Sequence, residues 1–389
     1  MKKILYLSFY FEPDLCAGSF RNSPLARELA KQVTGAATID VITTVPNRYS
    51  SFSVEAQQEE HDGNLRICRI LLPAHKSGFT DQIKAFHHYY REVKKKIRYT
   101  EYDLVFASSS RLFTAYLGYI IASKRGIPLY LDIRDIFTDT LNDVIANRLV
   151  KYILLPVLRK IESAVFNYAI HINLISEGFK GYFAKYTKPK YSYYTNGIDQ
   201  DFIQSSNFEE LLVPNPITIT YAGNIGEGQG LHKIIPQAAK ILGNKYQFRV
   251  IGDGGARKLL EEAILQESVS NVSVEKPVIR TELLEIYKRS HYLFIHLNDY
   301  TAFEKVLPSK VFELAAFPRP IIAGVNGYAR FFIDQNVSNS ILVEPANPDK
   351  MVEEIQKYSF KIEKREVFIQ SFNRKQINTD MAASIGSFL

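Results

Sequence analysis

A lysine and a glutamate near residue 310 have the spacing to act together. Pro308 suits the first position of a helix, so Lys310 and Glu313 would share one face near the helix N-terminus. There a cation beside a carboxylate can hold a diphosphate and a ribose diol. The alternative is an intrahelical ion pair, which stabilises a helix only slightly. Spacing alone favours the ion pair.

Two glycine-rich segments could bring backbone amides close to a phosphate. Residues 221–231 contain four glycines, and residues 250–258 contain three, each after a strand-like run and before a helical one. Arg257 and Lys258 would stand in the first turn of the second helix, where cations oppose the helix dipole and an anionic ligand would remove the conflict. Flexible turns and a solvated basic pair remain the alternatives.

Short apolar runs alternate with amphipathic segments along the 389 residues, which predicts parallel sheets covered by helices. We expect strands at residues 4–11, 39–45, 65–72, 104–108, 129–133, 170–175, 191–195, 217–222, 248–251, 272–274, 293–297, 321–324 and 341–343. The clearest helical patterns are 111–124, 143–167, 256–266 and 349–358. A polar, proline-marked stretch at 201–215 reads as a linker.

The pattern predicts an α/β chain of two Rossmann-like, doubly wound domains facing across a cleft. Residues 1–200 would form the N-terminal domain and residues 216–363 the C-terminal domain. Residues 364–389 would form a helical segment that crosses back to the first domain. Ligands of such sheets bind beyond the carboxyl ends of the strands.

Composition argues against a disulfide-stabilised protein, a zinc-cluster protein and a membrane-spanning protein. Two cysteines, Cys16 and Cys68, cannot build a disulfide framework or a zinc cluster, which suits a reducing cytosol. No apolar run approaches the roughly 20 residues needed to span a bilayer, and the first apolar run reads as a buried strand. The net charge of +7 permits an anionic partner without choosing among nucleotide, lipid and nucleic acid.

Residues 83–98 form a basic amphipathic pattern. Phe86, Tyr89, Tyr90, Val93 and Ile97 fall on one face, and lysines, arginines and a histidine fill the other. Helices of this kind lie on anionic membranes. A stripe that faces the protein core beneath a solvated basic face is the alternative.

Eight segments, in order, resemble the retaining family 4 glycosyltransferases of the GT-B fold, over almost the whole chain. The branch it looks most similar to contains fucosaminyl- and N-acetylhexosaminyl-transferases of bacterial surface polysaccharides. The segments are residues 9–14 (FYFEPD) with Gly18, 44–47 (TVPN), 132–135 (DIRD), 176–178 (SEG), 196–199 (NGID), 221–231, 252–254 (GDG), and 308–310 (PSK) with Glu313. Their joint order and spacing carry the resemblance.

The resemblance implies a role for each matching residue. Glu313 would hold the ribose hydroxyls of the donor, and Lys310 and Arg257 would lie near its diphosphate. Gly18 would belong to the first-domain loop that closes over the phosphates, and Asp135, with Arg134, to the acceptor side. Completing the set, the donor-binding residues are Gly18, Gly223, Asn224, Arg257, Ser309, Lys310 and Glu313, and the catalytic candidates are Asp135, Lys310 and Glu313.

Three positions depart from the pattern of the family. Lys305 stands where the first glutamate of the paired-glutamate motif is expected, with Glu304 one position out of register. Asn224 stands where many members carry an arginine, and Gln229 near a usual lysine. Neutralisation of the diphosphate would therefore rest on fewer cations.

The implied enzyme is a metal-independent hexosyltransferase without a cofactor. It would move an N-acetylhexosamine or deoxyhexosamine from UDP to a glycan or polyprenyl-diphosphate-linked acceptor in O-antigen or capsule assembly. We expect it in the cytoplasm, peripheral on the inner face of the plasma membrane, without a nucleic-acid partner. A nucleotide-sugar epimerase of the same fold and a non-catalytic nucleotide-sugar binder remain alternatives. A dinucleotide oxidoreductase fits less well, because neither glycine loop completes its fingerprint.

Overall fold

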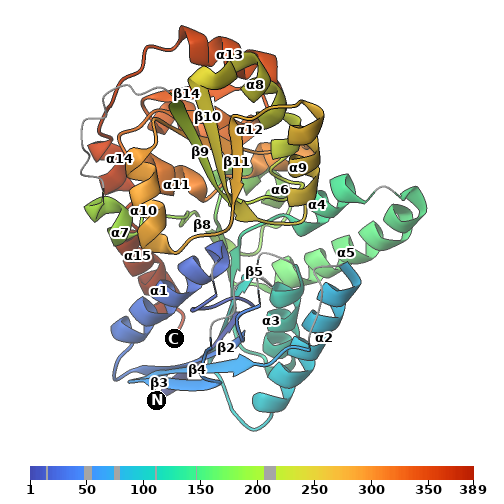
Figure 1. The fold of residues 1–389 in the computed structure, drawn as a ribbon. Helices are drawn as coiled ribbons and strands as arrows, with labels where there is room; N and C mark the ends of the chain where they lie inside the picture. The colour runs from blue at the N-terminus through green and yellow to red at the C-terminus, as the bar shows by residue number, and fades with distance from the viewer. Residues whose placement is uncertain (15, 48–54, 74–78, 110–111, 146, 206–215) are drawn as a thin grey trace. The chain divides into compact units, whose positions relative to one another are not determined.

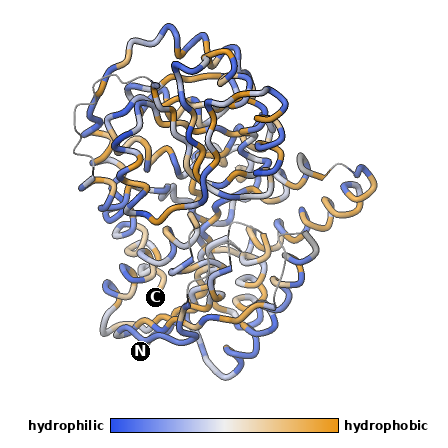
Figure 2. The backbone as a smooth tube through the Cα atoms, viewed as in Figure 1, coloured by the Kyte–Doolittle hydropathy of each residue, from blue (hydrophilic) through white to orange (hydrophobic). Residues whose placement is uncertain are grey.

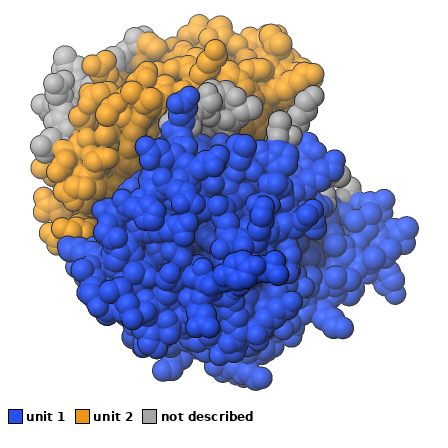
Figure 3. Space-filling model, turned by 90° about the horizontal axis from the view of Figure 1, so that it is seen from below, with its two compact units in different colours: residues 1–196, 376–389 blue, residues 197–375 orange. Residues whose placement is uncertain are grey.

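The computed structural model describes residues 1–14, 16–47, 55–73, 79–109, 112–145, 147–205 and 216–389 (Figure 1). The chain forms two compact units, one of residues 1–196 with 376–389 and one of residues 197–375 (Figure 3). Most of the linker predicted at 201–215 lies outside the described residues. Within the described ranges, no helix has the length and apolarity needed to cross a membrane.

Unit 1 is built on a sheet with the strand order β3-β4-β2-β1-β5-β6-β7-β8 among its described residues. Every pairing is parallel except that of β3 with β4. The strands are β1 (Lys2–Ser8), β2 (Ala37–Thr44), β3 (Glu59–Asp62), β4 (Leu65–Ile70), β5 (Leu104–Ser109), β6 (Leu129–Ile133), β7 (His171–Leu174) and β8 (Lys190–Ser192). The helices are α1 (Ala17–Gln32), α2 (Phe79–Lys96), α3 (Leu112–Arg125), α4 (Phe137–Val144), α5 (Arg148–Tyr168) and α6 (Lys180–Phe183).

Unit 2 holds an all-parallel sheet, ordered β11-β10-β9-β12-β13-β14 in the described part of the chain. Its strands are β9 (Ile217–Asn224), β10 (Tyr246–Asp253), β11 (Val272–Glu275), β12 (Tyr292–His296), β13 (Ile321–Gly324) and β14 (Ser340–Val343). Its helices are α7 (Gln200–Gln204), α8 (Ile235–Leu242), α9 (Arg257–Gln266), α10 (Arg280–Arg289), α11 (Lys310–Ala315), α12 (Gly327–Asn336), α13 (Pro348–Lys357) and α14 (Glu366–Ser371).

The strands of unit 2 are apolar on both faces because both faces are covered. In β12, Leu293 and Ile295 join a core with residues of α10, α11 and α12. Tyr292 and Phe294 join a second core with residues of α8, α9 and α13. Parallel strands covered on both sides read as continuous apolar runs, which is why the sequence pattern located them. Figure 2 shows these runs as orange segments inside the unit.

The last helix, α15 (Arg374–Gly386), begins in unit 2 and continues into unit 1. Met381, Ala382 and Ile385 are buried in the core of unit 1, together with residues of β1 and α1. The end of the chain therefore contributes to the folding of the unit that the beginning of the chain forms.

The basic amphipathic pattern of residues 83–98 corresponds to α2. Its apolar stripe is used by the protein core, since Tyr89 and Val93 are fully buried and Ile97 nearly so. Tyr89 also donates a hydrogen bond to the carbonyl of Ile42, 2.7 Å away. For this helix the core-facing alternative holds, and the exposed face is mainly charged.

Candidate functional site

Lys310 and Glu313 occupy the first turn of α11 in unit 2. The Nζ of Lys310 lies 3.3 Å from the Oε2 of Glu313, and the two side chains are 23% and 16% exposed. Val311, Phe312 and Leu314 face the core beneath them, as the spacing predicted. The pair is thus partly buried on one face of a firmly anchored turn.

The environment of Lys310 keeps it charged. Burial alone would lower the pKa of Lys310, but the Glu313 carboxylate, with the Tyr287 and Tyr221 hydroxyls, outweighs burial and raises it. Tyr287 is fully buried, and burial raises its pKa to about 12. Because Lys310 is an ammonium ion at any physiological pH, it can attract an anionic ligand.

The carboxyl ends of β9 and β10 approach each other so closely that only glycine fits. Gly223 and Gly252 are paired across the strands. A Cβ on Gly252 would lie 1.8 Å from the carbonyl oxygen of Gly223, and a Cβ on Gly223 would lie 2.4 Å from the Cε of Lys310. The Lys310 side chain therefore lies directly over Gly223. Gly223 belongs to the first glycine-rich segment, residues 221–231, which we call the glycine loop.

Asn224 and Gln229 close the glycine loop on itself. The Nδ2 of Asn224 donates to the Oε1 of Gln229 at 2.8 Å, and the amide of Gly226 donates to the same oxygen at 3.2 Å. A Cβ on Gly226 would meet the Asn224 amide at 2.4 Å. Asn224 and Gln229, two of the three residues that depart from the family pattern, are therefore partners of each other.

A buried histidine supports the other end of this loop. The Nδ1 of His296 bonds the carbonyl of Gln229 at 2.5 Å, and the amide of Ala346 donates to its Nε2 at 2.9 Å. Only a neutral imidazole protonated at Nδ1 can make both bonds. Burial accordingly lowers the pKa of His296 to about 4.

His296 should make the unfolding free energy sensitive to mild acid. Since the pKa of His296 is about 4 in the folded protein and near 6.5 when unfolded, the unfolded chain binds the proton first as pH falls. We expect wild type to lose about 2 kcal/mol between pH 7 and pH 5 from this group. Denaturant melts at both pH values should show a smaller loss in His296→Asn. Equal losses in both proteins would contradict the prediction.

Arg257 lies at the edge of the site with its guanidinium already engaged. Its Nη1 donates to the carbonyls of Gly252 at 2.9 Å and Glu275 at 3.3 Å, and its Nε pairs with Glu261 at 2.9 Å. The cation predicted near the diphosphate thus binds the ends of β10 and β11. Lys258, its neighbour, is 87% exposed.

Ser309, another of the predicted donor residues, precedes α11 and is half-buried. Its carbonyl accepts from the amide of Phe312 at 3.2 Å, and its side chain makes no capping hydrogen bond. Lys305 and Glu304 lie in the turn before it. The Glu304 carbonyl packs against Gly327, where a Cβ would come within 2.1 Å.

In unit 1, the structure brings together two residues that the sequence assigned to different substrates. A Cβ on Gly18 would lie 2.7 Å from Nη1 of Arg134, so the guanidinium covers the first turn of α1. Within the described ranges, the buried Nε of Arg134 and the buried hydroxyl of Ser19 have no hydrogen-bond partner. The N-terminus of α1 and a guanidinium thus share one place, a combination that attracts anions.

Asp132, two residues before Arg134, forms an ion pair with another arginine, Arg21. Asp132 accepts two bonds from Arg21, at 2.8 and 2.9 Å, and both side chains are almost fully buried. Ser108 and Asn173 also donate to Asp132, each at 2.8 Å. Burial alone would raise the pKa of Asp132, but the charge of Arg21 outweighs it and lowers the pKa. Sequence analysis assigned no role to this network.

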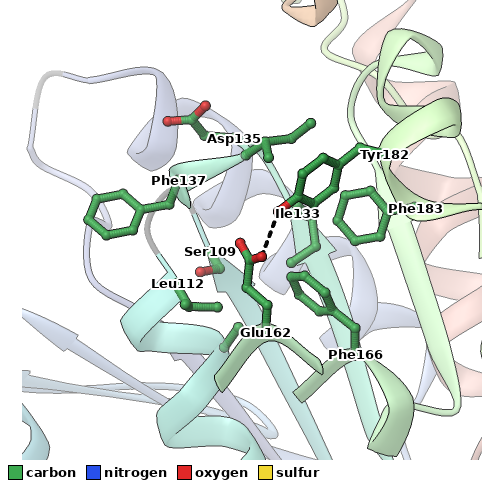
Figure 4. Close-up of a pocket in the computed structure, with 11 residues that line it drawn as sticks. Ser109, Leu112, Ile133, Asp135, Phe137, Glu162, Phe166, Tyr182 and Phe183 are labelled. Atoms are coloured by element: carbon green, nitrogen blue, oxygen red, sulfur yellow. Dashed lines mark hydrogen bonds between the residues drawn. The ribbon is translucent and has the colours of Figure 1, made fainter. Parts of the chain in front are cut away.

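Asp135 lines a small pocket at the carboxyl ends of β5 and β6, together with Ser109, Glu162 and Tyr182 (Figure 4). Glu162 is buried on α5, where it accepts from Thr138 at 2.6 Å and from Tyr182 at 2.5 Å. Burial raises the pKa of Glu162 in spite of these bonds. The Asp135 carboxylate points away from that of Glu162. Sequence analysis did not anticipate this second carboxyl group.

The profile of the family described as Glycosyl transferases group 1 matches residues 203–374. The match covers nearly the whole of unit 2 and less than half of the chain. It contains Lys310, Glu313 and both glycine loops. Within the described residues no group of three or more His, Cys, Asp or Glu side chains could hold a metal ion.

Among curated proteins, the chain matches WcaI of Escherichia coli (strain K12), named for a glycosyl transferase role in colanic acid biosynthesis. The two are 25% identical over 143 residues, which cover 36% of this chain. The match spans 35% of the length of WcaI, so it does not extend to the relative as a whole.

Solved structures share the fold of the entire chain. Sucrose-phosphate synthase from Thermosynechococcus elongatus superposes with a TM-score of 0.76 at 13% identity, covering 100% of this chain and 99% of that one. Anabaena HepE in complex with UDP-glucose superposes with a TM-score of 0.68 at 14% identity, with both chains fully covered. The protein thus has the GT-B fold, with two Rossmann-like α/β units, as predicted.

Proposed function

We propose that this chain is a glycosyltransferase whose second unit binds a nucleotide diphosphate sugar. The observation that carries the proposal is the Lys310 side chain, which lies over Gly223 and pairs with Glu313 where β9 runs into the glycine loop. An ammonium ion, a carboxylate and closely approachable backbone amides suit a diphosphate and a ribose. The group 1 profile over residues 203–374 supports the same conclusion.

In the proposed reaction, Lys310 and the amides of the glycine loop stabilise the charge that develops on the departing nucleotide diphosphate. Glu313 accepts hydrogen bonds from the ribose hydroxyls, and Gly223, Asn224 and Ser309 complete the donor site. Arg257 supports the donor site indirectly, because its guanidinium holds the ends of β10 and β11 in place. The sugar is transferred with retention and without a metal ion.

Unit 1 is proposed to bind the acceptor. Asp135 orients the acceptor hydroxyl, or accepts its proton, from the pocket at the ends of β5 and β6. Arg134 and Gly18, which contact each other, would hold an anionic group of a substrate at the N-terminus of α1. This assigns residues 1–200 to the acceptor side and residues 216–363 to the donor side.

The finer substrate assignment follows the resemblance and the relatives. We propose UDP as the nucleotide, since HepE was crystallised with UDP-glucose. An N-acetylhexosamine or deoxyhexosamine is proposed as the sugar. A glycan or polyprenyl-diphosphate-linked sugar of a bacterial surface polysaccharide is proposed as the acceptor, in keeping with the colanic acid role in the name of WcaI. The enzyme would work in the cytoplasm at the inner face of the plasma membrane.

Thermal unfolding with a panel of nucleotides tests the donor site. We expect UDP and UDP-sugars to raise the melting temperature, since a ligand at one hundred times its Kd adds about 2.7 kcal/mol of stability. Glu313→Gln should weaken this effect for UDP, whereas Glu262→Gln, an exposed glutamate of α9, should leave it unchanged. If no nucleotide stabilises the protein, the proposal is wrong. Release of UDP only with an acceptor present would separate transfer from epimerisation.

A further inference from the structure

The first half of α5 exposes several apolar side chains to solvent. The most exposed are Leu149 at 68%, Tyr152 at 81%, Ile153 at 63% and Val157 at 53%. Together with Val150 they form what we call the α5 surface. Isolated exposed apolar residues are ordinary, but a contiguous set on one helix indicates a partner.

Folding of unit 1 does not require the α5 surface. The same helix packs inward through other residues, namely Leu155, Leu158, Val165 and Phe166, all of which are buried. In Figure 1 the first half of α5 projects away from the rest of unit 1, and in Figure 2 it is largely orange. The exposed apolar residues are therefore additional to those that the core uses.

Basic residues surround the α5 surface. Arg148, Lys151, Arg159 and Lys160 are interspersed with the apolar residues, and residues 147–161 contain no aspartate or glutamate. An anionic lipid surface satisfies both features at once, because its acyl boundary accepts apolar side chains and its headgroups attract cations. A second copy of the chain would bring like charges together.

We propose that the α5 surface docks on an anionic membrane. The helix lies near the proposed acceptor site, because its second half supplies Glu162 and Phe166 to the pocket that Asp135 lines (Figure 4). One helix thus joins a lipid-facing surface to the pocket, as delivery of a lipid-linked acceptor would require. This role rests on the proposed function, but the docking itself does not.

Flotation with lipid vesicles tests the docking directly. Wild type should float with vesicles of phosphatidylcholine and phosphatidylglycerol, and less with phosphatidylcholine alone or at high salt. Tyr152→Ser with Ile153→Ser should weaken binding about tenfold or more, and so should Arg159→Gln with Lys160→Gln. The matched control is Lys94→Gln with Lys95→Gln on α2, which removes the same charge beside a buried apolar stripe and should bind like wild type.

Three results would overturn the proposal. They are absence of wild-type binding to anionic vesicles, unchanged binding of the Tyr152 and Ile153 variant, and an equal loss in the α2 control. A dimer in analytical ultracentrifugation that this variant dissociates, without vesicle binding, would assign the surface to a second copy instead. Stabilisation by UDP is measured without vesicles, so failure of docking and failure of the proposed donor site are distinguishable.

Discussion

Lys310→Met is expected to lower kcat/KM for the nucleotide sugar by about 100- to 1000-fold, the usual effect of removing one donor that stabilises transition-state charge. Methionine keeps most of the length and volume of lysine but carries no charge. Because the pair that Lys310 forms with Glu313 is partly exposed, the melting temperature should change by only a few degrees.

The control for this experiment is Lys258→Met, which removes the same charge from the first turn of α9. Lys258 is 87% exposed and pairs with Glu262, so we expect kcat/KM within about twofold of wild type. Steady-state rates of nucleotide release would be measured for both variants. Near-wild-type turnover in Lys310→Met would remove Lys310 from the catalytic machinery.

The sequence predicted the sheets well because burial on both faces leaves a strong apolar signal. The run beginning at Ile4 is a fully buried strand, as expected. The strand that it missed, β3, lies at the edge of the unit 1 sheet and has mostly exposed polar residues, EEHD. An edge strand of this kind is specified by its partner β4 rather than by its own pattern.

Contacts within the candidate site could be predicted from the sequence only between residues that are close together in the chain. Lys310 and Glu313 are three apart on one turn, so helical spacing brings them together. Arg134 and Gly18 meet only through the fold, and so do Glu162 and Tyr182. The partners of Arg257 are mainly backbone carbonyls, which no side-chain pattern records.

The α2 and α5 helices show that an amphipathic sequence pattern does not predict what its apolar face contacts. Both carry apolar and basic residues, and only α2 suggested a membrane surface from its spacing. Burial separates the two helices, since Tyr89 and Val93 of α2 are in the core while Tyr152 and Ile153 of α5 are exposed. The membrane surface that we propose therefore lies on α5. An amphipathic pattern states that one face is apolar, but the tertiary structure determines what covers that face.

Arg21→Met is expected to lower the free energy of unfolding of unit 1 by about 3–5 kcal/mol, because it leaves the buried charge of Asp132 without its cation. Arg21 also donates to the carbonyls of Thr195 at 2.9 Å and Tyr194 at 2.7 Å. Its loss therefore releases the segment after β8 as well. Hydrogen–deuterium exchange of β1 and β6 in urea would report this unit separately from unit 2.

The matched control is Arg66→Met, which removes an exposed arginine paired with Glu59 at 3.1 Å and should cost less than about 1 kcal/mol. Adding Asp132→Asn to Arg21→Met removes the stranded charge and leaves an amide whose oxygen can still accept from Asn173 and whose NH2 group can donate to the Ser108 hydroxyl. We expect this double variant to recover at least half of the lost stability. A loss no larger than that of Arg66→Met, or no recovery in the double variant, would show that the stranded charge is not the cause.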